Sequence, residues 1–351
     1  MRWTEPKYGK KAVRKAGEAL ISDWKDFRAV ARSFDVLSNW RSAHAYPIQA
    51  VLMLLRGKAS TVDTKALIVQ RLKRTPSILA KLRRERGMKL ERMEDIGGCR
   101  AVVATTKHAR RLARLLVESR TRHNLCRERD YISRPKSSGY RGIHLVYRYG
   151  GEKKAFEGLA VEVQIRSKIQ HSWATAVEVA GAFTRYALKA SQGPNEWLDY
   201  FKYASAELAR LEGCEVHPDL AGIDTAAELD RLSEKLDVRH RLRTFAVTTE
   251  NLGKQTHNKT DFFLLVLDMK ESIVQVTRFA VHELDAATDR YAMLEKQFRK
   301  DDFRDVVLVS ASSISALKQG YPNYFADTAA FVGYLEQADR ASNSIQRTPI
   351  R

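Results

Sequence analysis

The chain has 351 residues, 44% of them hydrophobic and 29% charged, a composition typical of a globular protein with room for two domains that each bury a core. No apolar stretch follows the charged first residues, and the longest apolar run, 262–267, is too short for a bilayer, so we expect neither a secretory signal nor a membrane span. Three widely spaced cysteines suggest neither a disulfide framework nor a zinc site and favour a reducing compartment, the cytoplasm.

The positive charge of the chain is unevenly distributed. The formal net charge is +19, and from Arg71 to Arg129 there are 18 Lys and Arg against 6 Asp and Glu, a net +12. Such a stretch is either a solvated face or a surface for polyphosphate or RNA. The motifs inside it, described below, favour the second interpretation.

Helical periodicity and capping residues predict the helices of the first half of the chain, and short apolar runs predict its strands. Thr75 followed by Pro76 places a cap before a proline at the first helical position, and Thr106 caps a helix with Leu112 and Leu116 on its apolar side. The helices are expected at 12–30, 48–55, from 75 onward, at 106–116 and at 167–188. The strands are expected at 101–104, 143–147 and 159–165.

The second half of the chain begins with a break. Ser191-Gln192-Gly193-Pro194 interrupts the helical pattern and predicts a domain boundary. Beyond it we expect a charged helix at 225–243, a hairpin of strands 262–267 and 273–279, a helix at 285–298, a strand at 306–309 and a last helix at 325–335. The predicted organisation is a helical segment at 1–60, a central domain at 61–190, a helical linker at 191–250, a C-terminal α+β domain at 251–340 and a polar tail at 341–351.

A first group of basic residues surrounds the helix predicted after Thr75. Ser77 and Lys81 are four residues apart and therefore share one helical face, and Arg71 and Lys73 precede the helix. Such a group can bind a triphosphate through charge-assisted hydrogen bonds. By itself it is also compatible with an ordinary solvated helix.

Two carboxylates stand on separate predicted strands. Asp95 precedes Gly97-Gly98 and the strand at 101–104, whereas Glu162 alternates with apolar residues along 159–165, so that Glu162, Gln164 and Arg166 share one face. The alternatives are an Asp-containing turn and a solvent-exposed strand face. A magnesium-bridged phosphoryl transfer, however, needs two such carboxylates.

The loop between these strands contains Pro135-Lys136 and Gly139-Tyr140. A turn of this kind could present Lys136 to a phosphate and the ring of Tyr140 to a base. The alternative is an ordinary hairpin turn.

Taken in order, the motifs resemble a known family. Arg-x-Lys-x3-Ser-x3-Lys, Asp-Ile-x-Gly-x-Arg, Asp-Tyr-Ile-x-x-Pro-Lys-x-x-Gly-Tyr-Arg and Val-Glu-Val-Gln-Ile-Arg occur between Ala66 and Glu178, and their order closely resembles the RelA/SpoT synthetase domain, which makes the alarmones guanosine tetra- and pentaphosphate. The resemblance implies an α/β fold in which helices flank a mixed sheet related to nucleotidyltransferases. A small α+β domain is expected behind it.

The resemblance also implies roles for the residues that bind the donor, ATP. Arg71 and Arg100 would sandwich its adenine, and three residues would hold its phosphates, namely Lys73, Ser77 and Lys81. Asp95 and Glu162 would bind the cofactor Mg²⁺, and Glu162 would take the proton of the attacking 3′-hydroxyl.

On the acceptor side, the resemblance implies that Tyr140 stacks on the acceptor base. The acceptor and phosphate pockets would be lined by Arg129, Lys136, His144, Gln164 and Arg166. His171 and Trp173 extend the strand motif as in small synthetases, and for them packing and catalytic roles are both open.

The chain departs from the family pattern at two positions. Ser138 stands where the family usually has Asn, which helps to read guanine, and Gly142 stands where it usually has Ser. The His-Asp pair of the hydrolase domain is also missing, so we expect synthesis without hydrolysis.

The expected reaction transfers the β,γ-pyrophosphate of ATP to the 3′-hydroxyl of GDP or GTP, releasing AMP. One alternative is a toxic synthetase of the same family that pyrophosphorylates the 3′ end of tRNA. A second is a catalytically inactive nucleic-acid-binding module. The C-terminal domain could sense a ligand, form a homo-oligomer or restrain the active site.

Overall fold

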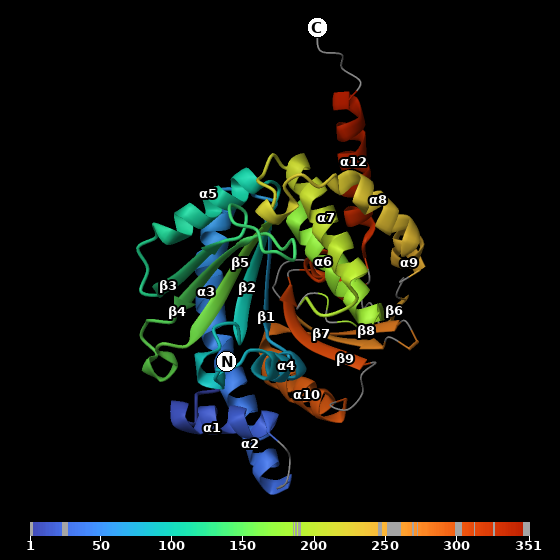
Figure 1. The fold of residues 1–351 in the computed structure, drawn as a ribbon. Coiled ribbons are helices and arrows are strands. Elements are labelled where there is room, and N and C mark those ends of the chain that lie inside the picture. The colour runs from blue at the N-terminus through green and yellow to red at the C-terminus, as the bar shows by residue number, and fades with distance from the viewer. Residues whose placement is uncertain are drawn as a thin grey trace.

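The computed structural model describes residues 3–22, 27–184, 186, 188, 191–244, 248–250, 261–268, 270–271, 273–298, 304–311, 313–325 and 327–346. Its centre is a single sheet with the strand order β3-β4-β5-β2-β1-β9-β7-β8-β6 (Figure 1). The strands are β1 (Leu67–Leu72), β2 (Gly97–Val103), β3 (Asn124–Asp130), β4 (Ile143–Arg148), β5 (Ala160–Ser167), β6 (Thr248–Glu250), β7 (Asp261–Asp268), β8 (Ile273–Phe279) and β9 (Arg304–Ala311).

The sheet is mixed, as predicted. β2 pairs in parallel with β5, and β6 pairs in parallel with β8, whereas the other neighbours are antiparallel. The predicted hairpin of β7 and β8 is present, with Leu265 opposite Val276. β1 pairs with β9 only at Gln70 and Arg71, so the C-terminal strands continue the sheet of the central motifs.

The helices of the first half are α1 (Lys10–Ile21), α2 (Phe27–Ala43), α3 (Ala45–Ser60), α4 (Thr75–Arg84), α5 (Thr106–Val117) and α6 (Lys168–Thr184). Those of the second half are α7 (Asn195–Leu211), α8 (Thr225–Lys235), α9 (Val238–Thr244), α10 (Leu284–Gln297), α11 (Ile314–Gly320) and α12 (Ala329–Gln346). The short 3-10 turns η1 (Leu90–Arg92) and η6 (Pro322–Phe325) complete the elements used below. Within the described residues, no helix combines the length and apolar character of a membrane span.

The two faces of the sheet have different roles because side chains alternate along each strand. On one face, odd-numbered residues of β2 and β5 such as Val103 and Val163 pack against α3 and α5 in a buried core. Glu162 and Gln164 lie on the other face, which we call the polar face. The alternation predicted for β5 is therefore confirmed.

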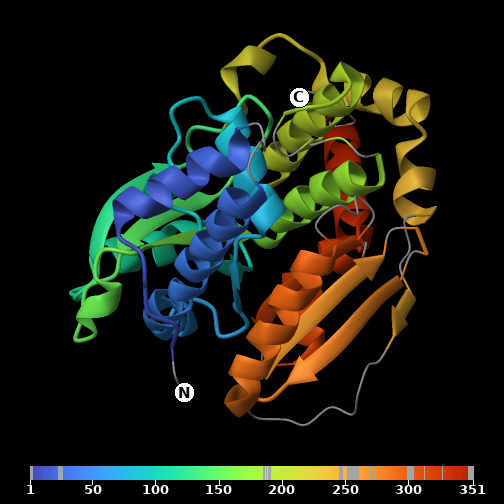
Figure 2. The ribbon, with the colours of Figure 1, turned by 90° about the horizontal axis from the view of Figure 1, so that it is seen from below.

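The C-terminal strands follow the same alternation. Val307 and Val309 on the polar-face side pack against Leu317 of α11 and against Tyr321 and Tyr324. On the opposite side, α10 lies along β7 and β9 (Figure 2), where Tyr291 and Leu294 pack on Leu264 and Val306. The segment α11–η6 thus reaches the polar face directly beside β1.

Several element boundaries differ from the sequence predictions. The helix expected at 12–30 ends at Ile21, because Ser22 takes an extended conformation with ψ 171°. The helix expected at 225–243 divides between α8 and α9, because Asp237 has a left-handed φ of 48°. Thr105 caps α5 in place of Thr106, since its side chain accepts a hydrogen bond from the backbone N–H of His108. The last helix begins at Ala329 instead of 325.

Other elements were not predicted at all. β3 is rich in charged and polar residues and is an edge strand whose outer positions face solvent, so its apolar signal is weak. β1 has the apolar run Leu67–Val69, which is too short by itself to separate a strand from a helix. α7 lies within the segment 191–250 that is predicted as a helical linker, but its bounds were not predicted. The predicted linker, C-terminal domain and tail include residues 245–247, 251–260 and 347–351, which lie outside the described residues. The division into domains stays a prediction.

Candidate active site

Two carboxylates lie at the same end of the parallel pair β2 and β5. Glu162 of β5 is opposite Gly98 of β2, and Asp95 lies two residues before β2 begins. A side chain at position 98 would place its Cβ 3.1 Å from the backbone oxygen of Glu162, so glycine keeps this approach open. Asp95 and Glu162 are near enough for the charge of Glu162 to act against ionisation of Asp95.

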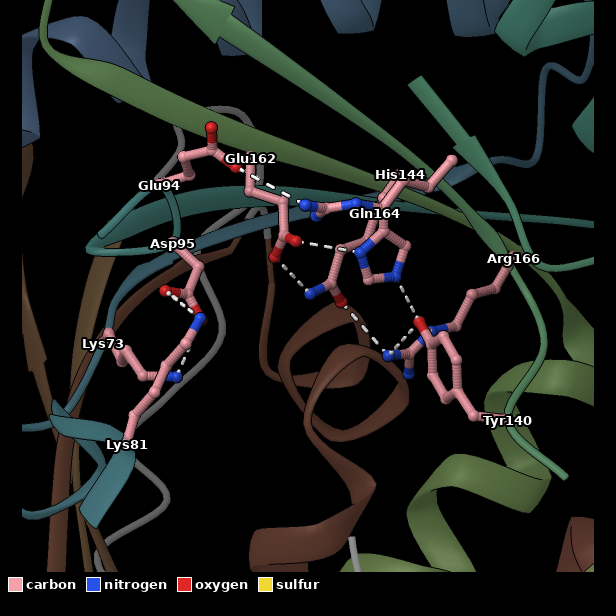
Figure 3. A network of polar contacts seen from close by, with 10 residues as sticks. Lys73, Lys81, Glu94, Asp95, Tyr140, His144, Glu162, Gln164 and Arg166 are labelled. Carbon is pink, nitrogen blue, oxygen red and sulfur yellow. Dashed lines mark hydrogen bonds and ion pairs between the residues drawn. The ribbon is translucent and has the colours of Figure 1, made fainter. Parts of the chain in front are cut away.

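Two lysines from the segment before and within α4 hold Asp95. Lys73 Nζ and Lys81 Nζ each lie 3.0 Å from one of its two carboxylate oxygens (Figure 3). Burial alone would raise the pKa of Asp95, but the two lysines outweigh it and place the pKa below its ordinary value. Asp95 is therefore ionised at neutral pH, and the lysines are gathered where a polyphosphate would meet them.

Glu162 is held from the opposite side by neutral partners. His144 Nδ1 is 2.8 Å from its Oε1, and Gln164 Nε2 donates to its Oε2 at 2.7 Å. Burial would raise the pKa of Glu162, but His144, Gln164 and then Lys73 lower it well below its ordinary value. Burial lowers the pKa of His144, so a neutral ring donating from Nδ1 accounts for this contact.

The residues expected on the acceptor side extend the contacts of His144 and Gln164. Tyr140 Oη lies 2.5 Å from His144 Nε2 and accepts from Arg166 Nη2 at 3.1 Å. Arg166, only 1% exposed, also donates to Gln164 Oε1 at 3.1 Å. Tyr140, His144, Glu162, Gln164 and Arg166 therefore form one network, visible as a continuous line of contacts in Figure 3.

Lys136 and Arg129 stand at the edge of this network. Lys136 Nζ lies 4.6 Å from the ring centre of Tyr131 and 5.3 Å from that of Tyr140, and burial lowers its pKa. Arg129 Nη2 lies 3.8 Å from Glu94 Oε2. Glu94, which the sequence reasoning did not single out, also pairs with Arg127 at 3.2 Å; its position next to Asp95 was the only signal.

The arginines expected to sandwich adenine occupy neighbouring strands. Arg71 of β1 and Arg100 of β2 lie diagonally on the polar face, since Arg100 is opposite Val69, two residues before Arg71. Burial, followed by the charges of Arg166 and Arg71, lowers the pKa of Arg100 to about 10. Its Nε has no hydrogen-bond partner among the described residues. A buried cationic pair of this kind is suited to stacking and to anionic ligands.

In this structure the segment α11–η6 covers that pair. Arg100 Nη1 donates to the backbone oxygen of Gly320 at 3.4 Å, and Tyr321 Oη donates to Gln70 O at 2.7 Å. Burial would lower the pKa of Arg71, but the charge of Glu178, followed by Tyr324 and Tyr321, raises it above its ordinary value. Side chains from the C-terminal part thus lie where the donor base is expected.

The remaining predicted residues are peripheral. Ser77 lies one turn before Lys81 on α4, and its side chain makes no hydrogen bond within the described part of the chain. Trp173 Nε1 donates to Phe201 O at 2.8 Å, and the ring packs in the core of α6 and α7. His171 Nε2 lies 3.1 Å from Gln319 O. The contacts of Trp173 and His171 are those of packing residues.

Together these groups define a class of site, namely paired carboxylates between two lysines and a histidine network, suited to polyphosphate chemistry. Residues 70–185 match the family description "Region found in RelA / SpoT proteins". GTP pyrophosphokinase YjbM of Bacillus subtilis (strain 168) is 35% identical over 115 residues, which are 31% of this chain and 52% of that protein. The chain thus spans about half the length of this curated relative and contains a region that matches the RelA/SpoT description.

Two solved structures are also similar. The small alarmone synthetase 1 from Bacillus subtilis bound to its product pppGpp gives a TM-score of 0.42 at 24% identity, covering 48% of this chain and 89% of that chain. A GTP pyrophosphokinase family protein from Streptococcus pneumoniae gives 0.41 at 22% identity, covering 53% and 93%.

Proposed function

We propose that the chain is a magnesium-dependent pyrophosphokinase that transfers the β,γ-pyrophosphate of ATP to the 3′-hydroxyl of GDP or GTP and releases AMP. The observation that carries this proposal is the placement of ionised Asp95 and Glu162 between the Lys73–Lys81 pair and the His144 network. The name of the curated relative, GTP pyrophosphokinase, supports the same reaction.

The residues present fit a magnesium ion. Asp95 and Glu162 offer the hard carboxylate oxygens that Mg²⁺ prefers, and substrate phosphates and water ordinarily supply its other ligands. No group of three or more His, Cys, Asp or Glu in metal-binding geometry occurs among the described residues, which agrees with an ion shared with a substrate. When bound, such an ion would neutralise charge on the transferring group.

We assign each step of the proposed transfer to particular side chains. Lys73 and Lys81 bind the donor phosphates, which compete for the two ammonium groups that now hold Asp95. Glu162, kept ionised by its partners, accepts the proton as the 3′ oxygen forms its bond to the β-phosphorus of ATP. The bond between that phosphorus and the bridging oxygen breaks, and AMP leaves with the oxygen.

A second candidate acceptor, the 3′ end of tRNA, is favoured by one observation. A groove of about 330 Å³ is lined by Lys10, Arg14, Glu91, Arg92, Arg148 and Gly158. Arg148 pairs with Ala160, two residues before Glu162 on the same face of β5. A basic groove this near the carboxylates could hold phosphates that a mononucleotide lacks. The arginines of α5, by contrast, lie on the helix that covers the opposite face.

The test is to incubate the purified chain with γ-labelled ATP, Mg²⁺ and, separately, GDP, GTP, ATP or deacylated tRNA. We expect label on the guanine nucleotide together with release of AMP. Label on tRNA alone would replace the first candidate by the second. Absence of AMP with every acceptor would favour the inactive binding module.

A further inference from the structure

A cavity opens on the side of Tyr140 away from the central sheet. It has a volume of about 200 Å³ and lies between the loop 137–140, α6 and α7. Its apolar walls include Tyr140, Trp173, Val177 and Phe201. Because the hydroxyl of Tyr140 belongs to the His144–Arg166 network, the cavity shares a wall with the candidate active site.

The shape and lining of the cavity suit a purine. The rings of Tyr140 and Trp173 have centres 6.3 Å apart and planes tilted by 60°, so they form adjoining walls, and the face of one ring can stack with a nucleobase. Ligand cavities of this kind combine apolar walls with a few polar groups that fix orientation. The polar groups here are Ser138 on the loop and two charged residues on α7.

Those two residues, Asp199 and Lys202, are three residues apart on α7 and therefore share a face of the helix. Both are partly buried. Neither side chain makes an ion pair or a hydrogen bond within the described part of the chain, not even with the other. Opposite charges that have no partner among the described residues, beside an aromatic cavity, are available to a ligand.

The serine at position 138 suggests what Asp199 and Lys202 bind. The family usually has Asn at this position, and an Asn side chain offers one acceptor and one donor group to a base edge. A serine hydroxyl is shorter and cannot make the same two contacts. Asp199 offers the acceptor and Lys202 the donor around the same cavity.

We propose that Asp199 and Lys202 read the base of the acceptor nucleotide, which is guanine. The carboxylate of Asp199 accepts from the ring N1–H and the 2-amino group, and the ammonium of Lys202 donates to O6 or N7. Adenine has no N–H at position 1 and would leave the carboxylate poorly matched. This inference rests on the proposed function, and α7 lies outside the matched residues 70–185.

The test is equilibrium binding of GDP, IDP and ADP to the full chain, measured by calorimetry without ATP. The wild-type chain should prefer GDP to IDP, which lacks the 2-amino group, and both to ADP. Asp199→Asn should weaken GDP binding at least about tenfold, the scale of a hydrogen bond to a charged group, and should reduce the preference for GDP over IDP. Lys202→Met should weaken GDP and IDP equally.

Two further variants separate a specific loss of GDP binding from general damage to the folded protein. Asp289→Asn, which changes an exposed Asp on α10, should bind GDP like the wild type. Ser138→Asn added to Asp199→Asn should restore part of the lost affinity, because it returns the amide. Unchanged GDP binding by Asp199→Asn, or a wild-type chain that binds no GDP or prefers ADP, would overturn the inference. Because no turnover is measured, a chain that reads GDP but transfers nothing would refute only the proposed reaction.

Discussion

At the scale of single residues, Glu162 is fixed by two neighbours that leave it charged. His144 and Gln164 each use one hydrogen bond to hold one of its oxygens, so the carboxylate is oriented before any substrate binds. Preorganisation of this kind contributes to rate because nothing needs to rearrange in the transition state.

Glu162→Gln should therefore abolish most of the transfer while leaving the fold intact. Loss of one preorganised electrostatic group costs on the order of 3 kcal/mol of barrier, about a hundredfold in rate. A glutamine side chain has nearly the same shape as the glutamate it replaces, so the core behind β5 should stay packed, although its NH2 group would face one of the two donors that now hold Glu162. The measurement is kcat for AMP release, with circular dichroism to establish folding. Near-wild-type turnover by the folded variant would mean that β5 does not supply the base.

Most residues of the candidate site could be predicted from the sequence, but the segment α11–η6 that covers Arg71 and Arg100 could not. Asp95, Lys73 and Lys81 occur within one short segment, so their spacing was enough to suggest that they act together. The contact of Arg100 with Gly320 joins residues 220 positions apart, and no local pattern encodes it. Asp199 and Lys202 on α7 were equally hidden, since the segment 191–250 was predicted only as a helical linker and no pattern in it points to the Tyr140 loop.

At the scale of elements, a buried ion pair joins α2, α4 and α10. Arg41 Nη1 lies 2.7 Å from Glu295 Oε2, and the backbone N–H of Thr75 donates to Glu295 Oε1 at 3.0 Å. The guanidinium of Arg41 also lies 4.6 Å from the ring centre of Tyr291. Burial alone would raise the pKa of Glu295, but Arg41 and Thr75 lower it. Helix α10 is thus fastened to the start of α4, the helix that contains Ser77 and Lys81.

Glu295→Gln should destabilise the protein strongly, because it leaves the buried charge of Arg41 without a partner. Breaking such a pair from one side costs about 3–5 kcal/mol. The matched control is Glu228→Gln, whose pair with Arg231 is exposed on α8 and should leave the free energy of unfolding nearly unchanged. Urea unfolding of both variants measures the difference; equal effects would contradict the prediction.

At the scale of the whole molecule, stability should fall in mild acid because three histidines are buried and uncharged. Burial lowers the pKa of His44 to about 4 and that of His171 to about 3, and it also lowers that of His144. The unfolded chain binds protons at these residues below about pH 6.5 whereas the folded chain does not. Their stabilising contribution is therefore complete above about pH 6.5 and is lost as the pH falls towards the folded values.

Each buried histidine should lower the free energy of unfolding by up to about 1.4 kcal/mol for each unit by which the pH falls within that window. The melting temperature should decline between about pH 6.5 and pH 4. His171→Gln should make the decline shallower, since it removes one of the three groups. A melting temperature that stays level over this range, or an equal slope in the variant, would show that the histidines titrate alike in both states.

The same molecule combines a candidate catalytic face with a C-terminal segment that covers the place expected for the donor base. β9 extends the sheet beside β1, and α11–η6 packs across the polar face from Val309 to Arg100. If the donor base stacks between Arg71 and Arg100, as the family resemblance implies, it cannot do so while Tyr321 and Gly320 occupy their surroundings. Donor binding and detachment of this segment should therefore be linked, since a ligand favours the state that exposes its site.

Tyr324→Ala should consequently strengthen ATP binding even as it lowers stability. Tyr324 is buried in the contact between α11–η6 and the sheet, so truncating it weakens the covering segment and also removes packing in the core. The expected result is a lower melting temperature without ATP, a larger upward shift on adding ATP than in the wild type, and faster release of AMP. Leu294→Ala, which removes packing on the opposite side of the sheet, serves as a control for packing loss alone. If ATP stabilises Tyr324→Ala no more than the wild type, the segment does not limit access to the donor site.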